Sequence, residues 1–134
     1  MEPVSIAALP REMPDEGIYL FSEGSEHLYV GRSNTIRKRL QKHCQPKSGH
    51  NSATFAFRLA RQNTGMTQAT YSTEGSRLHL ERDPNFAEVF TAQKERVRNM
   101  GVRFVSETEP IRQALLEMYV AVSLGTPHND FDNH

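Results

Sequence analysis

Two short runs of β-forming residues, each with one tyrosine, most strongly constrain how this chain folds. They are GIYLFS at residues 17–22 and HLYVGR at residues 27–32, and the turn-rich sequence EGSE separates them. Such a pattern predicts a β-hairpin. If its loop consists of the three residues 23–25, Tyr19 lies directly opposite Tyr29. Both phenols then project from one face, because side chains alternate along a strand.

A helix is predicted directly after the hairpin. Ser33 or Asn34 can cap it, and it should extend to about residue 44. Apolar residues recur at every fourth position and predict a buried stripe of Ile36, Leu40 and Cys44. Arg39 and His43 are also four residues apart, so we expect both side chains on one side of the helix.

The rest of the chain is predicted to form three further helices and at least one strand. The helices are expected at residues 52–62, 84–100 and 111–124, and the strand at residues 102–106; residues 71–81 are compatible with a strand pair. Asp83 and Pro84 favour the start of the second of these helices, as its cap and its first residue. We therefore expect an α/β chain of the α+β type, with a small three-stranded, mostly antiparallel sheet flanked by helices.

Length and composition exclude several classes of protein. A chain of 134 residues with 37% hydrophobic and 24% charged residues is typical of one globular domain. Cys44 is the only cysteine, which excludes an intramolecular disulfide and a four-cysteine zinc site. The first 21 residues lack a signal-peptide pattern, and no uncharged run reaches membrane-spanning length, so we expect a cytoplasmic protein without a membrane partner.

Charge is unevenly distributed, although the formal net charge is zero. Residues 27–73 contain no Asp or Glu but eight basic residues, namely Arg32, Arg37, Lys38, Arg39, Lys42, Lys47, Arg58 and Arg61. A cationic face binds a polyanion because neutralised phosphates release counterions, yet surface Lys and Arg are often only solvated. The charge pattern therefore agrees with a nucleic-acid partner and leaves the simpler interpretation open.

Glu117 is the only charged residue within residues 114–124. A helix that is apolar nearly all round is expected to be packed on most sides, so this carboxylate should lie near the interior and need a partner. A structural partner such as Arg112 or an arginine of the first helix is one interpretation. A hard divalent cation is the other.

The hairpin and the residues after it together resemble the GIY-YIG nuclease family. The resemblance rests on Gly17-Ile18-Tyr19, Tyr29-Val30-Gly31, Arg39 and a downstream glutamate, with valine in place of the motif isoleucine. It implies a three-stranded sheet flanked by helices. It also implies one domain over residues 1–134, with a core at about 15–44 and 102–130. Residues 45–101 would then be an insertion that serves substrate choice, dimerisation or only packing.

The resemblance implies roles for individual residues. Tyr19 would take a proton from the attacking water, and Tyr29 would be its partner across the hairpin. Because a phenol has a pKa near 10, nearby positive charge is needed to favour the phenolate, and Arg32 can supply it. Arg39 would contact the scissile phosphate, which suits its fork of donors.

Further residues would complete this site. His43 would hydrogen-bond the phosphate or relay a proton, although it could equally be a solvated residue at the helix end. Glu117 would hold one divalent ion, Mg²⁺ or Mn²⁺, and Asn129 would support the site from beyond the last helix. Three basic residues of the first helix would contact nucleic acid, namely Arg37, Lys38 and Lys42.

The function implied is that of a metal-dependent endonuclease that hydrolyses a phosphodiester bond, with DNA favoured over RNA. A domain of this size could need a homodimer or a partner protein for specificity. The first alternative is a catalytically inactive nucleic-acid-binding module of the same fold. The second is a small metal or interaction protein that uses His43, Cys44, His50 and His79. It is disfavoured because adjacent His43 and Cys44 cannot easily share one tetrahedral site.

Overall fold

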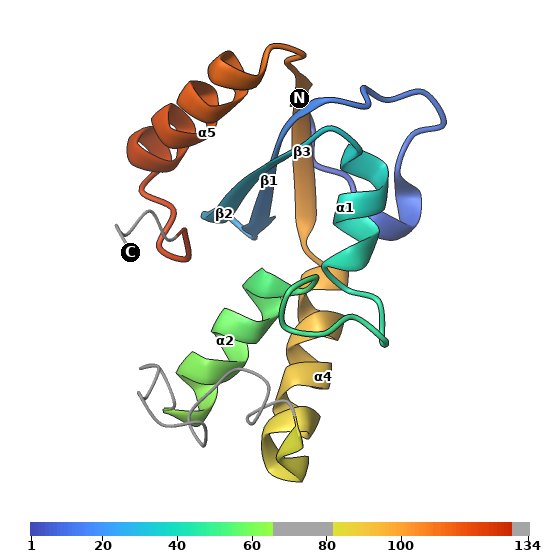
Figure 1. The fold of residues 1–134 in the computed structure, drawn as a ribbon, viewed down its shortest axis with the longest axis vertical. Coiled ribbons are helices and arrows are strands. Elements are labelled where there is room, and N and C mark those ends of the chain that lie inside the picture. The colour runs from blue at the N-terminus through green and yellow to red at the C-terminus, as the bar shows by residue number, and fades with distance from the viewer. Residues whose placement is uncertain (66–81, 130–134) are drawn as a thin grey trace. The chain divides into compact units, whose positions relative to one another are not determined.

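The computed structural model describes residues 1–65 and 82–129, and the chain divides into two compact units (Figure 1). The first unit comprises residues 1–40 and the chain from residue 99 onwards, and the second comprises residues 41–98. The elements in chain order are η1 (Ile6–Ala8), β1 (Gly17–Glu23), β2 (Glu26–Ser33), α1 (Ile36–Lys42), α2 (Thr54–Thr64), α4 (Pro84–Arg98), β3 (Gly101–Ser106) and α5 (Pro110–Leu124). The second unit has bounds close to those of the predicted insertion at 45–101, which stays a prediction.

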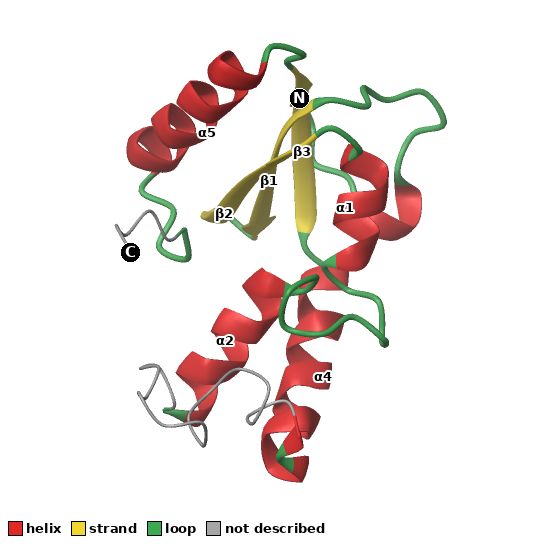
Figure 2. Cartoon of the chain, in the orientation of Figure 1, coloured by secondary structure: helices red, strands yellow, loops and turns green. Residues whose placement is uncertain are grey.

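The sheet of the first unit has the strand order β2-β1-β3, and both neighbouring pairs are antiparallel. One face carries Ile18, Leu20 and Val30, which pack with Ala121 of α5. Figure 2 shows the sheet between α5 on one side and α1 on the other. The predicted α+β fold with a three-stranded sheet flanked by helices is therefore confirmed.

The pairing of the hairpin strands differs from the predicted register. Tyr19 lies opposite Gly31, and Tyr29 lies opposite Phe21. The turn is shorter than predicted, because Glu23 already pairs with Glu26, and a bulge follows at Phe21/Ser22. Together these features shift the register by two residues, which preserves the face on which each side chain lies. The prediction that Tyr19 lies directly opposite Tyr29 is wrong, but the two tyrosines do share one face.

Both outer edges of the sheet are covered by segments near the ends of the described chain. Val4 pairs with Val102 of β3 through two backbone hydrogen bonds of 2.9 and 2.7 Å. At the other edge, the backbone amide of His128 donates to the carbonyl oxygen of Leu28 in β2 at 3.2 Å. These contacts satisfy backbone groups that an open edge strand would present to other chains.

The first helix, α1, is shorter than predicted. It ends at Lys42, and the side-chain oxygen of Ser33 accepts a hydrogen bond from the backbone amide of Thr35 at 2.9 Å, ahead of the first helical residue. The predicted stripe is nevertheless buried, because Ile36, Leu40 and Cys44 are each at most 6% exposed.

In the second unit, α2 and α4 pack through aromatic side chains. The ring of Phe57 lies 5.2 Å from that of Phe86 and 5.4 Å from that of Phe90, measured between centroids. The carboxylate of Asp83 accepts a hydrogen bond from the amide of Asn85 at 2.9 Å, which confirms the predicted start of this helix. The strand pair predicted within residues 71–81 lies outside the described residues.

Lys94 of α4 is a buried cation with defined partners inside the second unit. Its side chain is 5% exposed, and Nζ donates to the carbonyl oxygens of Pro46 at 2.8 Å and Ser48 at 3.0 Å. Nζ also lies 4.5 Å from the centroid of the Phe90 ring. These contacts offset the cost of burying the ammonium group and attach the loop before α2 to α4.

The last helix, α5, is covered on one side only. Its buried residues are Gln113 and Ala121, whereas five large apolar residues are 49–75% exposed, namely Ile111, Leu115, Met118, Tyr119 and Val122. The prediction that this helix is packed on most sides is wrong, because an apolar sequence does not by itself supply neighbours. Within residues 1–65 and 82–129, no helix is long and apolar enough to cross a membrane.

Candidate active site

Tyr19 lies at the centre of the candidate site, on the face of β1 that points away from α5. Its side chain is 2% exposed, and its ring meets that of Phe21 edge-on, with centroids 5.8 Å apart. The side chain of Arg39 in α1 makes a hydrogen bond to the Tyr19 phenol. The fold therefore brings together two of the residues that the sequence resemblance placed at the site.

The pKa of the Tyr19 phenol is raised well above its ordinary value of 10.0, mainly because burial disfavours the phenolate. The neighbouring phenol of Tyr29 raises this pKa further, while the charge and hydrogen bond of Arg39 lower it. Glu117 raises it too, as the smallest of these effects. In the free protein at neutral pH, Tyr19 is therefore a neutral phenol.

Each tyrosine motif contains a glycine because a side chain there would clash, and the clashing neighbour differs between the two motifs. A Cβ atom at Gly31 would lie 2.4 Å from both Cζ and the hydroxyl oxygen of Tyr19, inside van der Waals contact. A Cβ atom at Gly17 would lie 1.9 Å from the carbonyl oxygen of Val105 in β3. Gly31 thus leaves the space that the phenol occupies, and Gly17 allows β1 and β3 to pair.

Tyr29 is half-buried and lies beside the Phe21 ring, at a centroid distance of 6.4 Å. Phe21 therefore contacts the rings of both motif tyrosines. Phe21 is not among the residues predicted for the site. The available signal was its position two residues after Tyr19, on the same face of the strand.

Glu117 of α5 and Arg32 of β2 form a second group of interacting charges, and the charge of Glu117 also acts on the Tyr19 phenol. Arg32 pairs with Ile18 and so shares the face that α5 covers. Burial raises the pKa of the half-buried Glu117 carboxyl, and the charge of Arg32 lowers it. The role predicted for Arg32 is to favour the phenolate of Tyr19. In the structure Arg39 acts on that phenol, and Arg32 acts on Glu117.

Asn129 fastens the chain beyond α5 to the backbone of β2, between the two motif positions Tyr29 and Gly31. Its side-chain amide donates to the carbonyl oxygen of Val30 at 2.6 Å, and its Oδ1 accepts from the Val30 amide at 2.8 Å. The same Oδ1 also accepts from the hydroxyl of Thr126 at 2.8 Å. These contacts suit the supporting role that the resemblance implied for this residue.

His43 follows α1 directly and is fully buried. It lies four residues after Arg39 but outside the helix, which ends at Lys42. The side chain is not a solvated helix-end residue, so that alternative is wrong. Its predicted role toward a phosphate stays a prediction, and the burial would have to change for direct contact.

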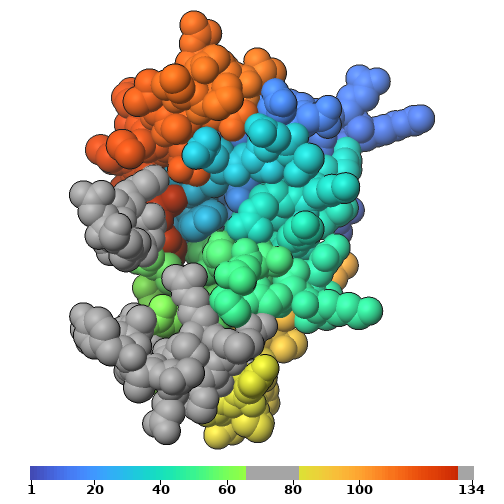
Figure 3. All heavy atoms as spheres, viewed as in Figure 1, coloured from blue at the N-terminus to red at the C-terminus, as the bar shows by residue number. Residues whose placement is uncertain are grey.

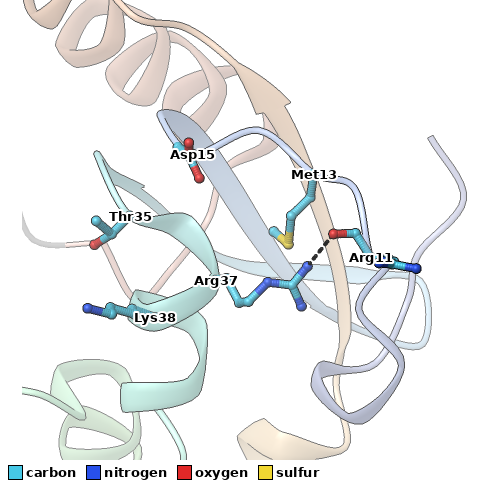
Figure 4. Close-up of a pocket in the computed structure, with 6 residues that line it drawn as sticks. All are labelled: Arg11, Met13, Asp15, Thr35, Arg37 and Lys38. Atoms are coloured by element: carbon cyan, nitrogen blue, oxygen red, sulfur yellow. Dashed lines mark hydrogen bonds between the residues drawn. The ribbon is translucent and has the colours of Figure 1, made fainter.

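Two of the predicted nucleic-acid contacts, Lys38 and Lys42, are exposed on α1. Arg37 is half-buried, and its guanidinium donates to the carbonyl oxygens of Pro10 at 2.5 Å and Arg11 at 3.1 Å. Figure 4 shows the hydrogen bond from Arg37 to Arg11, and both residues line a cavity of about 270 Å³. Arg37 therefore attaches the N-terminal segment to α1, which leaves Lys38 and Lys42 as the freer cations.

The Glu117 carboxylate supplies the oxygen donors that a small hard cation prefers. Within residues 1–65 and 82–129, no group of three or more His, Cys, Asp or Glu side chains could hold a metal ion. Mg²⁺ keeps several of its waters and often uses only one or two carboxylates. A single half-buried carboxylate whose ionised form is poorly solvated suits such an ion.

Comparison with known proteins agrees with this geometry. The GIY-YIG catalytic domain matches residues 16–83, which include the hairpin and α1 and extend into the predicted insertion. Glu117 and Asn129 lie beyond the matched residues. No curated protein and no solved structure matches the chain. Because the family covers half of the sequence, the chain belongs to the GIY-YIG catalytic domain family, a family of nucleases.

Proposed function

We propose that this protein is a metal-dependent endonuclease that hydrolyses a phosphodiester bond of DNA. The observation that carries the proposal is the contact between Tyr19 and Arg39, in which the oxygen of a buried phenol accepts a hydrogen bond from a guanidinium group. The charge and the hydrogen bond of Arg39 favour the phenolate form of Tyr19, and the phenolate is the form that can receive a proton from the attacking water.

Arg39 would serve two purposes in this mechanism. One part of its guanidinium group holds the Tyr19 phenol and lowers its pKa. Its other N–H donors would contact the non-bridging oxygens of the scissile phosphate, where negative charge increases during attack. The base and the phosphate would therefore be positioned by one side chain.

Tyr19 would accept the proton of the attacking water, with Tyr29 beside it on the same face. Burial opposes this step, because it favours the neutral phenol. The proton acceptor is then the small phenolate fraction, which rises tenfold with each unit of pH as long as the pH stays below the pKa of the phenol. Partly exposed Tyr29 lies where it can orient the attacking water, because its phenol is nearer to solvent than that of Tyr19.

Glu117 would hold the divalent ion, Mg²⁺ or Mn²⁺, whose charge stabilises the leaving oxygen. Arg32 would keep the Glu117 carboxyl ionised, because its charge lowers a pKa that burial raises. Asn129 would hold the Tyr29–Gly31 segment in place through its pair of hydrogen bonds to Val30. It acts as a positioning residue in this scheme and does not touch the substrate.

The proposal is tested by cleavage of supercoiled, single-stranded and branched DNA with Mg²⁺ or Mn²⁺, for the unaltered chain and for Glu117→Gln. The variant keeps the size of the side chain and removes its charge. We expect cleavage that requires the metal and that falls by at least about 100-fold in the variant. Cleavage that persists unchanged in Glu117→Gln or in excess chelator would contradict the metal role. RNA cleaved in preference to DNA would contradict the assigned substrate.

The burial of Tyr19 also favours a second candidate, namely a nucleic-acid-binding module of the same fold without activity. A phenol that remains neutral at neutral pH is compatible with a purely structural role. The same assay separates the two functions. DNA binding without cleavage of any of these substrates, with either metal ion, would favour the binding module.

A further inference from the structure

The outer side of α5 carries exposed apolar side chains that the candidate site does not use. Four of them define the surface that we call the α5 stripe, namely Ile111, Leu115, Met118 and Val122. Their exposed fractions range from 49% to 75%. Figure 3 shows α5 at the surface of the molecule. Contiguous apolar surface of this kind usually marks an interaction site.

Helical geometry places the α5 stripe opposite the side that packs on the sheet. Successive residues of an α-helix are rotated by about 100°, so the four stripe residues fall within about 60° of one another. Their mean direction is about 160–180° from that of Leu116, Val120 and Ala121, which pack on the sheet. The stripe is therefore a second apolar face, which the first unit does not itself cover.

We propose that the α5 stripe is the interface of a homodimer, in which the α5 helices of two copies pack antiparallel about a twofold axis. The spacing of the stripe is four, three and four residues, which reads the same in both directions. With the axis between residues 116 and 117, Ile111 faces the partner's Val122, and Leu115 faces the partner's Met118. A twofold interface requires such a self-complementary surface.

Charge favours a second copy as the occupant of this surface. No stripe residue is charged, and Glu117, the only charge within residues 114–124, lies outside the stripe and interacts with the charge of Arg32. Two identical faces can therefore meet without repulsion between like charges. Antiparallel packing also opposes the two helix dipoles and brings Arg112 near the C-terminal end of the partner's α5, where a cation is favoured.

The extent of the surface predicts a reversible dimer. A helix of 15 residues is about 22 Å long, so a single helix pair buries less than the roughly 800 Å² per partner of a standard stable interface. We expect half-dissociation at about 1–100 µM. Tyr19, Arg39 and Glu117 do not lie on the stripe, so dimerisation would leave both candidate sites accessible. The inference therefore stands independently of the proposed nuclease activity.

The test is sedimentation velocity of the full chain from about 1 to 300 µM, a range that brackets the expected dissociation constant. Leu115→Glu should raise that constant by at least about 100-fold, because the dimer would bury two unpaired carboxylates. Met118→Lys should do the same. An equimolar mixture of the two variants should recover dimers, because antiparallel packing places the carboxylate of one variant opposite the ammonium group of the other only in the mixed pair. Ser123→Glu, an exposed position of α5 beside the stripe, is the matched control and should leave the dimer intact.

Each result decides the proposal. Dimers of the unaltered chain, their loss in both single variants and their recovery in the mixture would support it. Thermal melting of the variants should match that of the unaltered chain at about 1 µM, because the altered side chains are exposed in the monomer. A chain that stays monomeric at 300 µM, a dimer that survives Leu115→Glu, or failure of the mixture to associate would overturn it. Binding to phospholipid vesicles in place of self-association would also overturn it.

Discussion

Replacing Gly31 with alanine should disable the site through a single methyl group. The added Cβ would lie 2.4 Å from Cζ and from the hydroxyl oxygen of Tyr19. Favourable carbon contacts begin at about 3.5 Å, so the Tyr19 ring must move by about 1 Å. The ring is 2% exposed and packs against Phe21, so there is little space to accept the movement.

The displacement predicts two measurable effects of Gly31→Ala. Overpacking of this kind costs about 1–3 kcal/mol, which chemical denaturation would show as a loss of unfolding free energy. The contact between Tyr19 and Arg39 would also be disturbed, and a misplacement of about 1 Å lowers the rate of a catalysed reaction by about 100-fold. We expect this loss in single-turnover DNA cleavage, with DNA affinity nearly unchanged.

Gly101→Ala is the matched control, because Gly101 is also a strand glycine. A Cβ atom there would lie 3.0 Å from the Cβ of Pro3, a milder contact than that at Gly31 and far from the phenol along the sheet. It should lower stability only slightly and leave cleavage unchanged. If Gly31→Ala cleaves DNA within about twofold of the unaltered chain and unfolds within about 0.5 kcal/mol of it, the steric reasoning is wrong.

Three further predictions follow from the same contacts. The single-turnover cleavage rate should rise about tenfold per pH unit through pH 6–8, because the raised pKa of Tyr19 keeps the phenolate a minor species; a flat profile would exclude it as the base. Asn129→Ala should cost about 2 kcal/mol in chemical denaturation by removing two hydrogen bonds to Val30, and an unchanged midpoint would contradict this anchoring role. The pKa of Glu117 is raised in the folded protein, so this group stabilises the fold below its unfolded pKa and loses that contribution as pH rises through the folded pKa. At neutral pH without metal, Glu117→Gln should therefore melt at a higher temperature than the unaltered chain, and a lower melting temperature would contradict the direction of the shift.

The sequence predicted the face of each hairpin side chain but could not predict the register. Alternation along the strands places Tyr19 and Tyr29 on one face for any even shift, whereas the turn length and the bulge at Phe21/Ser22 decide which residues are opposite. The family resemblance placed Tyr19 and Arg39 in one site but did not predict the hydrogen bond between them. The effect of Arg32 on Glu117 depends on the pairing of Arg32 with Ile18, which places Arg32 on the face that α5 covers. Local sequence does not reveal this strand pairing.

Burial was the least predictable property. His43 was expected to contact a phosphate or to lie in solvent at the helix end, and it is fully buried. The apolar helix α5 was expected to be enclosed and is exposed along the α5 stripe. Hydrophobic periodicity shows which side chains favour burial, but neighbouring elements or other chains decide which ones are covered. Both errors therefore arise because burial depends on tertiary contacts, which a local sequence pattern does not describe.

The central claim is that the Tyr19 phenol accepts the proton during DNA cleavage. Tyr19→Phe keeps the ring and its packing on Phe21 and removes only the hydroxyl group. With enzyme in excess over DNA and with Mg²⁺ present, we expect cleavage to fall by at least about 100-fold while DNA affinity changes by less than about twofold. Cleavage by Tyr19→Phe at the rate of the unaltered chain would contradict the account.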